Sequence, residues 1–151
     1  MNNIARAIAI IEGVPDVDDM GWLRRGFALA FRDGVGLEVA LGLPSTAARR
    51  RTALRDFWLE QAAARCNETL PWRRACELAR VGRVFASQTW PRWRRREAPP
   101  AEASALEQAL FYLHRHDGRV PSARRLHDLL CAATAIVDQD IAVNPARECS
   151  A

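Results

Sequence analysis

Arginine is the residue in this sequence with the clearest chemical use, and its distribution along the chain is uneven. All 22 basic residues of the 151-residue chain are arginine. Residues 47–96 contain 13 arginines and four acidic residues, a net charge of +9, whereas the remainder has a net charge of −5. A basic segment between more acidic ends is typical of a surface that binds phosphate groups. We expect its partner to be nucleic acid, with DNA favoured, or an acidic protein surface.

The first arginine cluster lies near the predicted start of a helix. Arg49, Arg50 and Arg51 fall in the first two turns, and Arg55 lies one turn further on. Positive charge at this end of a helix opposes the helix dipole, and a bound phosphate would reverse that effect. Consecutive residues point about 100° apart around a helix. The alternative interpretation is therefore a run of solvated side chains that converge on nothing.

The second cluster alternates tryptophan with arginine between residues 89 and 96. Trp90 and Trp93 are stacking or partner-anchoring candidates, and the same segment supplies four candidate phosphate contacts, Arg92, Arg94, Arg95 and Arg96. Aromatic rings stack on unpaired bases while arginine neutralises the backbone, and an arginine arm also fits a minor groove. Tryptophan is equally typical of protein interfaces and of cores. We expect at least one of the two rings to be buried and the arginines to remain free.

The third candidate is a pair of predicted helices, residues 102–116 and 122–138, on either side of Gly118. This arrangement is typical of a helix-turn-helix DNA reader, which consists of a helix, a short glycine-containing turn and a second helix with arginine near its start. The residues then expected to contact bases are Arg124, Arg125 and His127. The alternative is an ordinary helical hairpin in which Asp128 pairs with Arg124.

Motifs of enzymes and metal sites are missing from the sequence. The lack of lysine excludes a P-loop, Schiff-base chemistry and the kinase signature. The nearby residues His114, His116, His127 and Cys131 do not match a common zinc spacing. The aspartates near the N-terminus, Asp16, Asp18 and Asp19, lack the glycine and glutamate of a calcium loop. They are expected to cap the helix that follows. We expect no enzymatic activity, no cofactor and no metal.

The elements that must position these residues are predicted to be helices throughout. Strand patterns are nearly absent, and the expected helices are 2–12, 18–32, 37–41, 46–66, 71–88, 102–116 and 122–138. Small residues recur at helical spacing in one of them, at Ala75, Ala79, Gly82 and Ala86, which favours close approach of a neighbouring helix. The sequence predicts an all-α protein, a small multi-helix bundle with a C-terminal helix-turn-helix-like hairpin.

The clearest linker in the sequence is the proline-containing segment 94–101. It divides the chain into a helical bundle with a basic middle, residues 1–93, and a helical hairpin packed on it, residues 102–139. Residues 140–151 are expected to form a frayed tail.

The sequence also bears on the cellular compartment. No apolar run approaches the roughly 18–20 residues of a membrane span, so no membrane partner is expected. The N-terminal stretch lacks the basic start and the small-residue cleavage site of a signal peptide. The four cysteines include no CxxC pair, which favours reduced thiols. We expect a cytoplasmic protein.

Short stretches from Leu37 onward carry a resemblance to a group of bacterial proteins. They are Leu37-Glu38-Val39-Ala40-Leu41-Gly42-Leu43, Trp72-Arg73-Arg74-Ala75, Leu78-Ala79, Phe85, Trp90-Pro91-Arg92-Trp93-Arg94, Pro99-Pro100, Ser104, Leu110-Phe111 and Arg125-Leu126-His127. In these stretches the chain resembles small proteins carried by bacteriophages and integrated elements of Proteobacteria. The resemblance implies a mobile-element protein and carries over no activity and no functional residues.

These observations lead to two functional hypotheses. The first is a non-enzymatic nucleic-acid-binding protein, whose arginine-rich middle contacts phosphates and whose helix after Pro121 reads bases. The alternative is a protein-binding inhibitor or adaptor that acts on a host complex, such as a defence complex.

Overall fold

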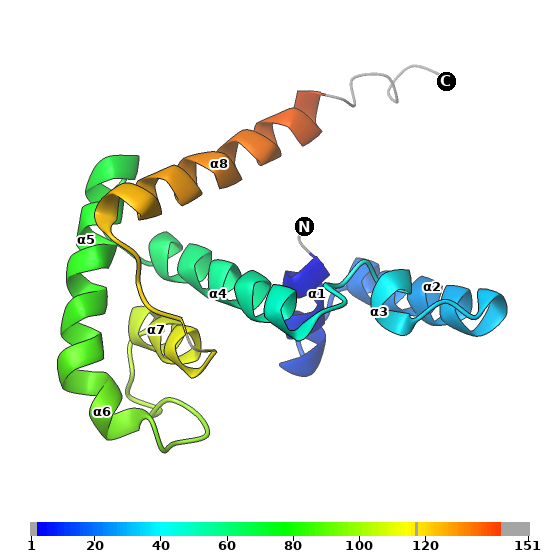
Figure 1. Ribbon diagram of the computed structural model, residues 1–151, viewed down its shortest axis with the longest axis horizontal. Helices are drawn as coiled ribbons and strands as arrows, with labels where there is room; N and C mark the ends of the chain where they lie inside the picture. The colour runs from blue at the N-terminus through cyan, green and yellow to red at the C-terminus, as the bar shows by residue number, and fades with distance from the viewer. Residues whose placement is uncertain (1–2, 117, 143–151) are drawn as a thin grey trace. The chain divides into compact units, whose positions relative to one another are not determined.

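Helices account for the regular structure of this protein (Figure 1). The computed structural model describes the backbone of residues 3–116 and 118–142 and the side chains up to residue 132. Within these ranges there is no strand, so the predicted all-α class is confirmed. The elements are α1 (Asn3–Ile11), α2 (Val17–Asp33), α3 (Leu37–Ala40), α4 (Ala47–Ala64), α5 (Pro71–Val84), η1 (Phe85–Thr89), α6 (Trp90–Trp93), α7 (Ala105–Arg115) and α8 (Ala123–Ala142). None of the helices described has the length and apolar composition needed to cross a bilayer.

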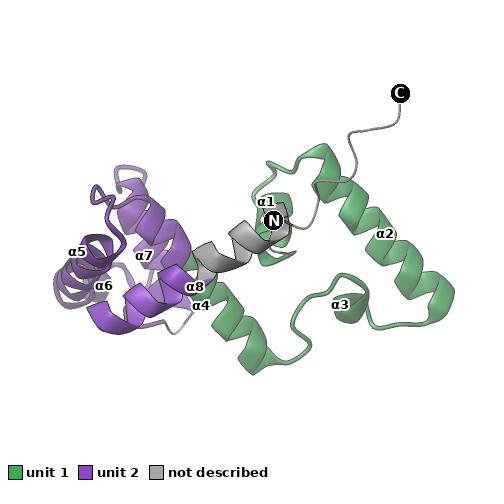
Figure 2. Cartoon of the chain, turned by 90° about the horizontal axis from the view of Figure 1, so that it is seen from above, with its two compact units in different colours: residues 1–58 green, residues 59–151 purple. Residues whose placement is uncertain are grey.

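The chain divides into two compact units, unit 1 (residues 1–58) and unit 2 (residues 59–151), which are coloured separately in Figure 2. The boundary between them falls inside α4, at Trp58. The expected division at segment 94–101 thus differs from the observed one. The prolines of segment 94–101 indicate where a helix ends. A boundary between two compact units depends instead on where the hydrophobic cores separate, which proline does not indicate.

Segment 94–101 is a loop that connects α6 to α7 inside unit 2. Its residue Pro100 is buried, and the carbonyl oxygen of Arg96 accepts a hydrogen bond of 2.6 Å from Nη1 of Arg115. At the other end of unit 2, α8 continues to Ala142, beyond the expected start of the tail at residue 140. Residues 143–151 of that predicted tail lie outside the described residues.

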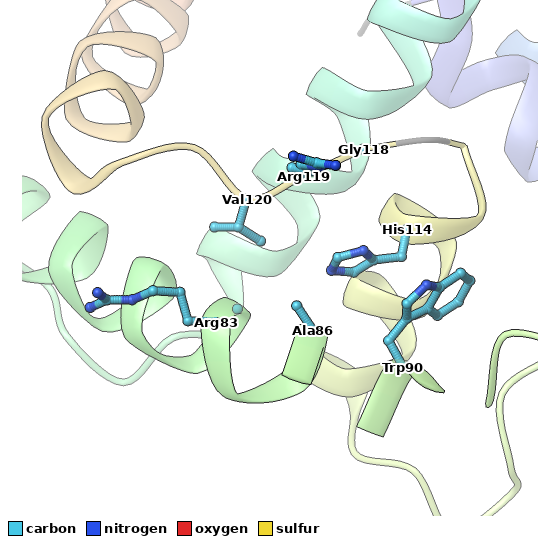
Figure 3. A pocket seen from close by; sticks show the side chains of 8 residues that line it. Arg83, Ala86, Trp90, His114, Gly118, Arg119 and Val120 are labelled. Atoms are coloured by element: carbon cyan, nitrogen blue, oxygen red, sulfur yellow. The ribbon is translucent and has the colours of Figure 1, made fainter. Parts of the chain in front are cut away.

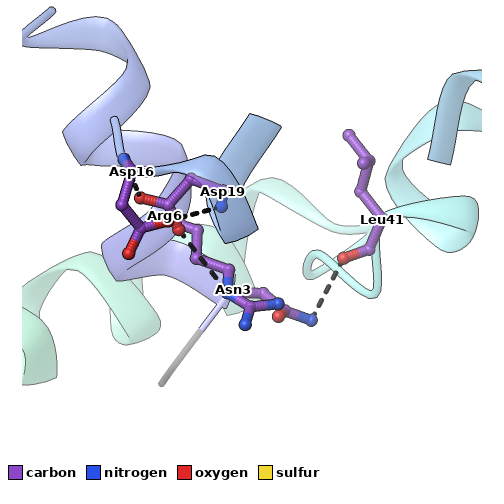
Figure 4. Close-up of polar contacts among 5 residues, drawn as sticks. All are labelled: Asn3, Arg6, Asp16, Asp19 and Leu41. Atoms are coloured by element: carbon purple, nitrogen blue, oxygen red, sulfur yellow. Dashed lines mark hydrogen bonds and ion pairs between the residues drawn. The ribbon is translucent and has the colours of Figure 1, made fainter. Parts of the chain in front are cut away.

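Polar contacts between α1, α2 and the end of α3 organise unit 1 (Figure 4). Asp16 and Asp19 form a capping box at the start of α2, in which the backbone N–H of each residue donates to the carboxylate of the other. The buried Asp19 carboxylate also lies 3.6 Å from Nε of Arg6 on α1. Nδ2 of Asn3 donates to the carbonyl oxygen of Leu41 at 3.1 Å. The N-terminal aspartates are therefore structural.

The core of unit 2 is assembled around α5, α7 and α8. Its fully buried large side chains are Leu78, Leu110, Phe111, Leu113 and Leu126. Helix α8 packs on α5, where Ala75, Ala79 and Gly82 are buried, as their spacing predicted. Ala86, the fourth residue of that row, is exposed instead.

A π-helical turn interrupts the helix predicted over residues 71–88. Pro91 has no backbone N–H to continue the α-helical pattern. The turn η1 accommodates it, and the N–H of Trp90 donates to the carbonyl oxygen of Phe85, five residues earlier. The extra residue shifts the direction of the following side chains. Trp90 and Trp93 therefore leave the helix toward the aromatic part of the unit 2 core.

Candidate nucleic-acid interface

The arginines of α5, of α6 and of the three residues that follow it carry positive charge that no described carboxylate neutralises in an ion pair. Residues 71–96 contain eight arginines and one acidic residue, Glu77, and seven of these arginines are exposed. None of the eight forms an ion pair with a residue that the structure describes. Arg74 and Arg83 donate instead to backbone carbonyl oxygens, of Glu68 at 2.9 Å and of Ala79 at 3.3 Å.

Three depressions of the unit 2 surface adjoin one another along α5, and we name them together the α5 groove. The first is lined in part by Trp72, Arg73, Cys76 and Arg80. The second shares Cys76 with the first and also contains Arg83 and the start of α8 at Ser122 and Ala123. The third shares Arg83 and Val120 with the second and extends to Trp90, His114 and Arg119. Because neighbouring depressions share lining residues, they follow one another along α5.

Charge and aromatic character are distributed along the whole α5 groove. Arg73 and Arg80 line its first depression, Arg83 its second and third, and Arg119 its third. The acidic lining residues, Glu68 and Glu77, are confined to the first depression. The carboxylate of Glu77 is engaged in a hydrogen bond within the protein, since its Oε2 accepts from the backbone N–H of Glu68 at 3.1 Å. A tryptophan lies at each end of the groove, Trp72 and Trp90.

The third depression is a pocket of about 470 Å³ beside Trp90 (Figure 3). The rings of Trp90 and His114 stack there with centroids 5.3 Å apart, and Figure 3 shows the imidazole directed toward the space between Ala86 and Val120. Nε2 of His114 is buried and has no hydrogen-bond partner among the residues that the structure describes. Burial lowers the pKa of this histidine, so the ring is neutral near pH 7.

The Trp90–Arg96 segment combines packed aromatic rings with solvated arginines. Trp90 contacts the edge of Phe111, and Trp93 contacts the edge of Phe85, each with ring centroids 5.7 Å apart. Both tryptophans are half-buried. The four arginines of the segment, Arg92, Arg94, Arg95 and Arg96, remain exposed. The rings thus fix the segment to unit 2 while the guanidinium groups face solvent.

The three predicted base-contacting residues lie in the first turns of α8 and differ in their exposure. Arg124 and Arg125 are exposed. His127 is half-buried, with its ring against the edge of Trp72 at a centroid distance of 5.6 Å. Its Nδ1 lies 3.8 Å from the Asp128 carboxylate. Asp128 therefore lies beside His127. The ion pair between Asp128 and Arg124, which the sequence offered as an alternative, is not among the ion pairs of the described residues.

The helices α7 and α8 differ in their surroundings from a compact helix-turn-helix. Such a reader packs its two helices against each other across a short turn. Here α8 takes α5 as its main partner, and the described part of the connection from α7 follows α5, with Val120 directly over Gly82. The first residue of α8, Ala123, lines the α5 groove, and Arg124 and Arg125 follow it in the first turn of the helix.

The arginines near the start of α4 belong to unit 1. Arg49, Arg50 and Arg51 are exposed, and the backbone N–H of Arg49 donates to Oγ1 of Thr46 at 3.2 Å. Arg55 is half-buried and forms an ion pair of 2.7 Å with Asp56. Thr46 satisfies one of the free N–H groups at this helix end, and the Arg55 charge is compensated.

Sequence patterns did not single out Arg73, Arg80, Arg83 or Arg119 as site residues. The row of small residues on α5 could have identified the arginines of that helix. It predicts where another segment packs against α5, and so it indicates which arginines lie beside that contact. The described side chains contain no group of three or more histidine, cysteine or acidic residues that is arranged to hold a metal ion.

Comparison with protein-family models, with curated proteins and with solved structures gives no match to this chain. The function of the α5 groove is accordingly argued from its own residues.

Proposed function

We propose that this chain is a non-enzymatic protein that binds nucleic acid along the α5 groove. The observation that carries the proposal is the set of exposed arginines between residues 71 and 96 that form no ion pair with a described carboxylate. Such arginines bind phosphates and release condensed counterions, which is the main source of sequence-independent affinity. A basic groove with aromatic rings along it also accepts bases. The resemblance described above suggests a bacterial mobile element as the setting.

Within this proposal the arginines have two roles. Those of the α5 groove and of the Trp90–Arg96 segment contact phosphates. Arg124 and Arg125 contact bases, because they are exposed in the first turn of α8 and arginine bonds guanine with two hydrogen bonds. His127, packed against Trp72, supports the helix turn that carries them.

The proposal is tested by fluorescence anisotropy with a labelled single strand and a labelled duplex, at about 50 and 200 mM salt. The wild-type protein should bind, and its affinity should fall steeply with salt. The variant Arg73→Ala/Arg80→Ala removes two exposed groove arginines and should reduce the slope of log K against log salt by about 0.7–0.9 for each phosphate that is no longer neutralised.

The matched control is Arg24→Ala/Arg25→Ala, which removes the same charge from exposed positions on α2 in unit 1. It should leave the slope close to the wild-type value. Equal losses in the two variants would mean that net charge alone governs binding, and an absence of wild-type binding at low salt would refute the proposal.

An acidic or apolar protein partner is the second candidate, and one side of α2 favours it. Val17 and Phe31 are more than four-fifths exposed there, and Phe27 stacks on Phe31 with centroids 6.2 Å apart. Exposed apolar side chains grouped on one helix are typical of interaction sites. In this second candidate function the protein is an inhibitor or adaptor that acts on a host complex. It is supported if the protein binds neither the single strand nor the duplex in the anisotropy experiment.

A further inference from the structure

The pocket beside Trp90 has walls that the backbone fixes in place. Gly82 on α5 forms part of one wall, and a Cβ atom there would overlap the side chain of Val120. Gly118 forms part of another, and a Cβ atom there would lie 2.6 Å from the carbonyl oxygen of Leu113. Gly82 thus allows the connection to α8 to approach α5 closely, and Gly118 allows it to turn tightly against the end of α7. The volume of about 470 Å³ falls in the range of ligand pockets, about 300–1,000 Å³.

The lining of this pocket is suited to a group that is both aromatic and anionic. Arg83 and Arg119 contribute to its lining, and none of the eight lining residues is acidic. Figure 3 shows the guanidinium of Arg83 directed away from Trp90 and His114, which leaves Arg119 to supply the positive charge of the pocket. Trp90 and His114 supply stacked rings at 5.3 Å. Nε2 of His114 is buried and has no hydrogen-bond partner among the described residues. Buried polar atoms are normally hydrogen-bonded, so a ligand that forms a hydrogen bond with this ring would satisfy it.

From this geometry we infer that the pocket holds one unpaired nucleotide of a single strand, with its base beside Trp90 and His114 and its phosphate on Arg119. The inference rests on the proposed function and extends it to the class of nucleic acid. The position of the pocket at one end of the α5 groove favours a strand over a free nucleotide, because the strand's neighbouring phosphates reach Arg73 and Arg80. A base paired in a duplex cannot enter a pocket of this kind without leaving the stack.

Filling the pocket tests the inference. Ala86 is exposed in η1 and lines the pocket, whereas Gln88 is exposed in the same turn and does not line it. Ala86→Trp should weaken binding of a labelled single strand about tenfold, the loss expected when one stacked base is excluded. Its affinity for a duplex should stay within about twofold of wild type. Gln88→Trp, which adds the same side chain outside the pocket, should change neither affinity.

A second variant covers the case in which Ala86→Trp does not fold, as judged by circular dichroism. Arg119→Ala removes one exposed guanidinium and should also weaken single-strand binding more than duplex binding. If wild type binds nucleic acid but both variants bind the single strand as wild type does, the pocket inference fails and the proposed function stands. If wild type binds neither nucleic acid, both fail. Adenosine monophosphate binding more tightly than the strand would assign the pocket to a free nucleotide and overturn the inference.

Discussion

At the scale of single residues, His114 illustrates how packing sets the charge of a side chain in the candidate site. Its ring stacks with the rings of Phe85 and Trp90 at centroid distances of 5.7 and 5.3 Å. These neighbours exclude water and offer no carboxylate, so burial lowers the pKa of the imidazole. A neutral ring suits stacking with a base, and a protonated ring would be costly in the same place.

This burial predicts how stability depends on pH. As the pH falls below 6.5, the ordinary pKa of histidine, the unfolded chain binds a proton that the folded His114 resists. The folded state therefore keeps this contribution to stability above pH 6.5 and loses it on acidification. His114→Phe should shift its urea midpoint less than wild type between about pH 7 and pH 5.

His116 sets the background of that measurement. Burial and the nearby Arg115 lower its pKa as well, so a residual pH dependence of the same sign should persist in His114→Phe. Identical pH dependence of wild type and variant would show that His114 is protonated equally in the folded and unfolded states.

At the scale of elements, α5 shows how a row of small residues determines a site. Ala75, Ala79 and Gly82 bring α8 and its preceding connection close to the helix. The arginines that flank this row then line the α5 groove.

A capping box determines where α7 begins. Ser104 and Glu107 form it, so the helix starts at Ala105, three residues after the start predicted from the sequence.

Substitution of glycine in two helices separates this packing role from helix propensity. Gly82→Ala should destabilise the protein by about 1–3 kcal/mol, because its Cβ atom would overlap Val120. Gly21→Ala in α2 meets only the flexible end of Arg25, at 3.3 Å, and should stabilise its helix by up to about 1 kcal/mol. Urea unfolding followed by circular dichroism measures both changes. An equally stabilising effect at the two positions would contradict the packing of Val120 on α5.

At the scale of the whole molecule, the basic middle of the sequence is shared between two units. Arg49, Arg50 and Arg51 belong to unit 1, and the arginines of α5 and α6 belong to unit 2. The excess of positive charge seen between residues 47 and 96 therefore divides at Trp58. Binding measurements on variants of the full chain separate the contributions of the two parts.

The two parts should respond differently to sequence. Arg49→Ala/Arg50→Ala/Arg51→Ala removes the exposed unit 1 arginines that the sequence predicts to contact phosphates. If they do so, binding to all DNA sequences should weaken alike, with the salt slope falling by up to about 0.9 for each phosphate left without an arginine. Arg124→Ala removes a proposed base reader and should weaken the preferred sequence by about 1–3 kcal/mol more than random DNA. Sequence selection followed by anisotropy on the selected site and on random DNA gives both values. A uniform loss in Arg124→Ala would reassign that residue to phosphate binding.

The sequence by itself determined the helical class and most of the helix positions, because these depend on signals within a few residues. Apolar spacing located α2 and α4, and the aspartates before α2 were expected to cap it, as Asp16 and Asp19 do. The spacing of small residues also predicted where a neighbour approaches α5, at Ala75, Ala79 and Gly82, although Ala86 of the same row is exposed. Local chemistry suffices for such features, since helix hydrogen bonds join residues four apart.

Only the tertiary structure decided the unit boundary, the π-helical turn before Pro91 and the α5 groove. Arg83 and Arg119 line one pocket although 36 positions separate them in the sequence. Their proximity depends on Gly82 accepting Val120, a contact between segments whose separation no local pattern encodes. Packing joins such segments through the combined shape of many side chains, and that shape exists only once the helices are assembled.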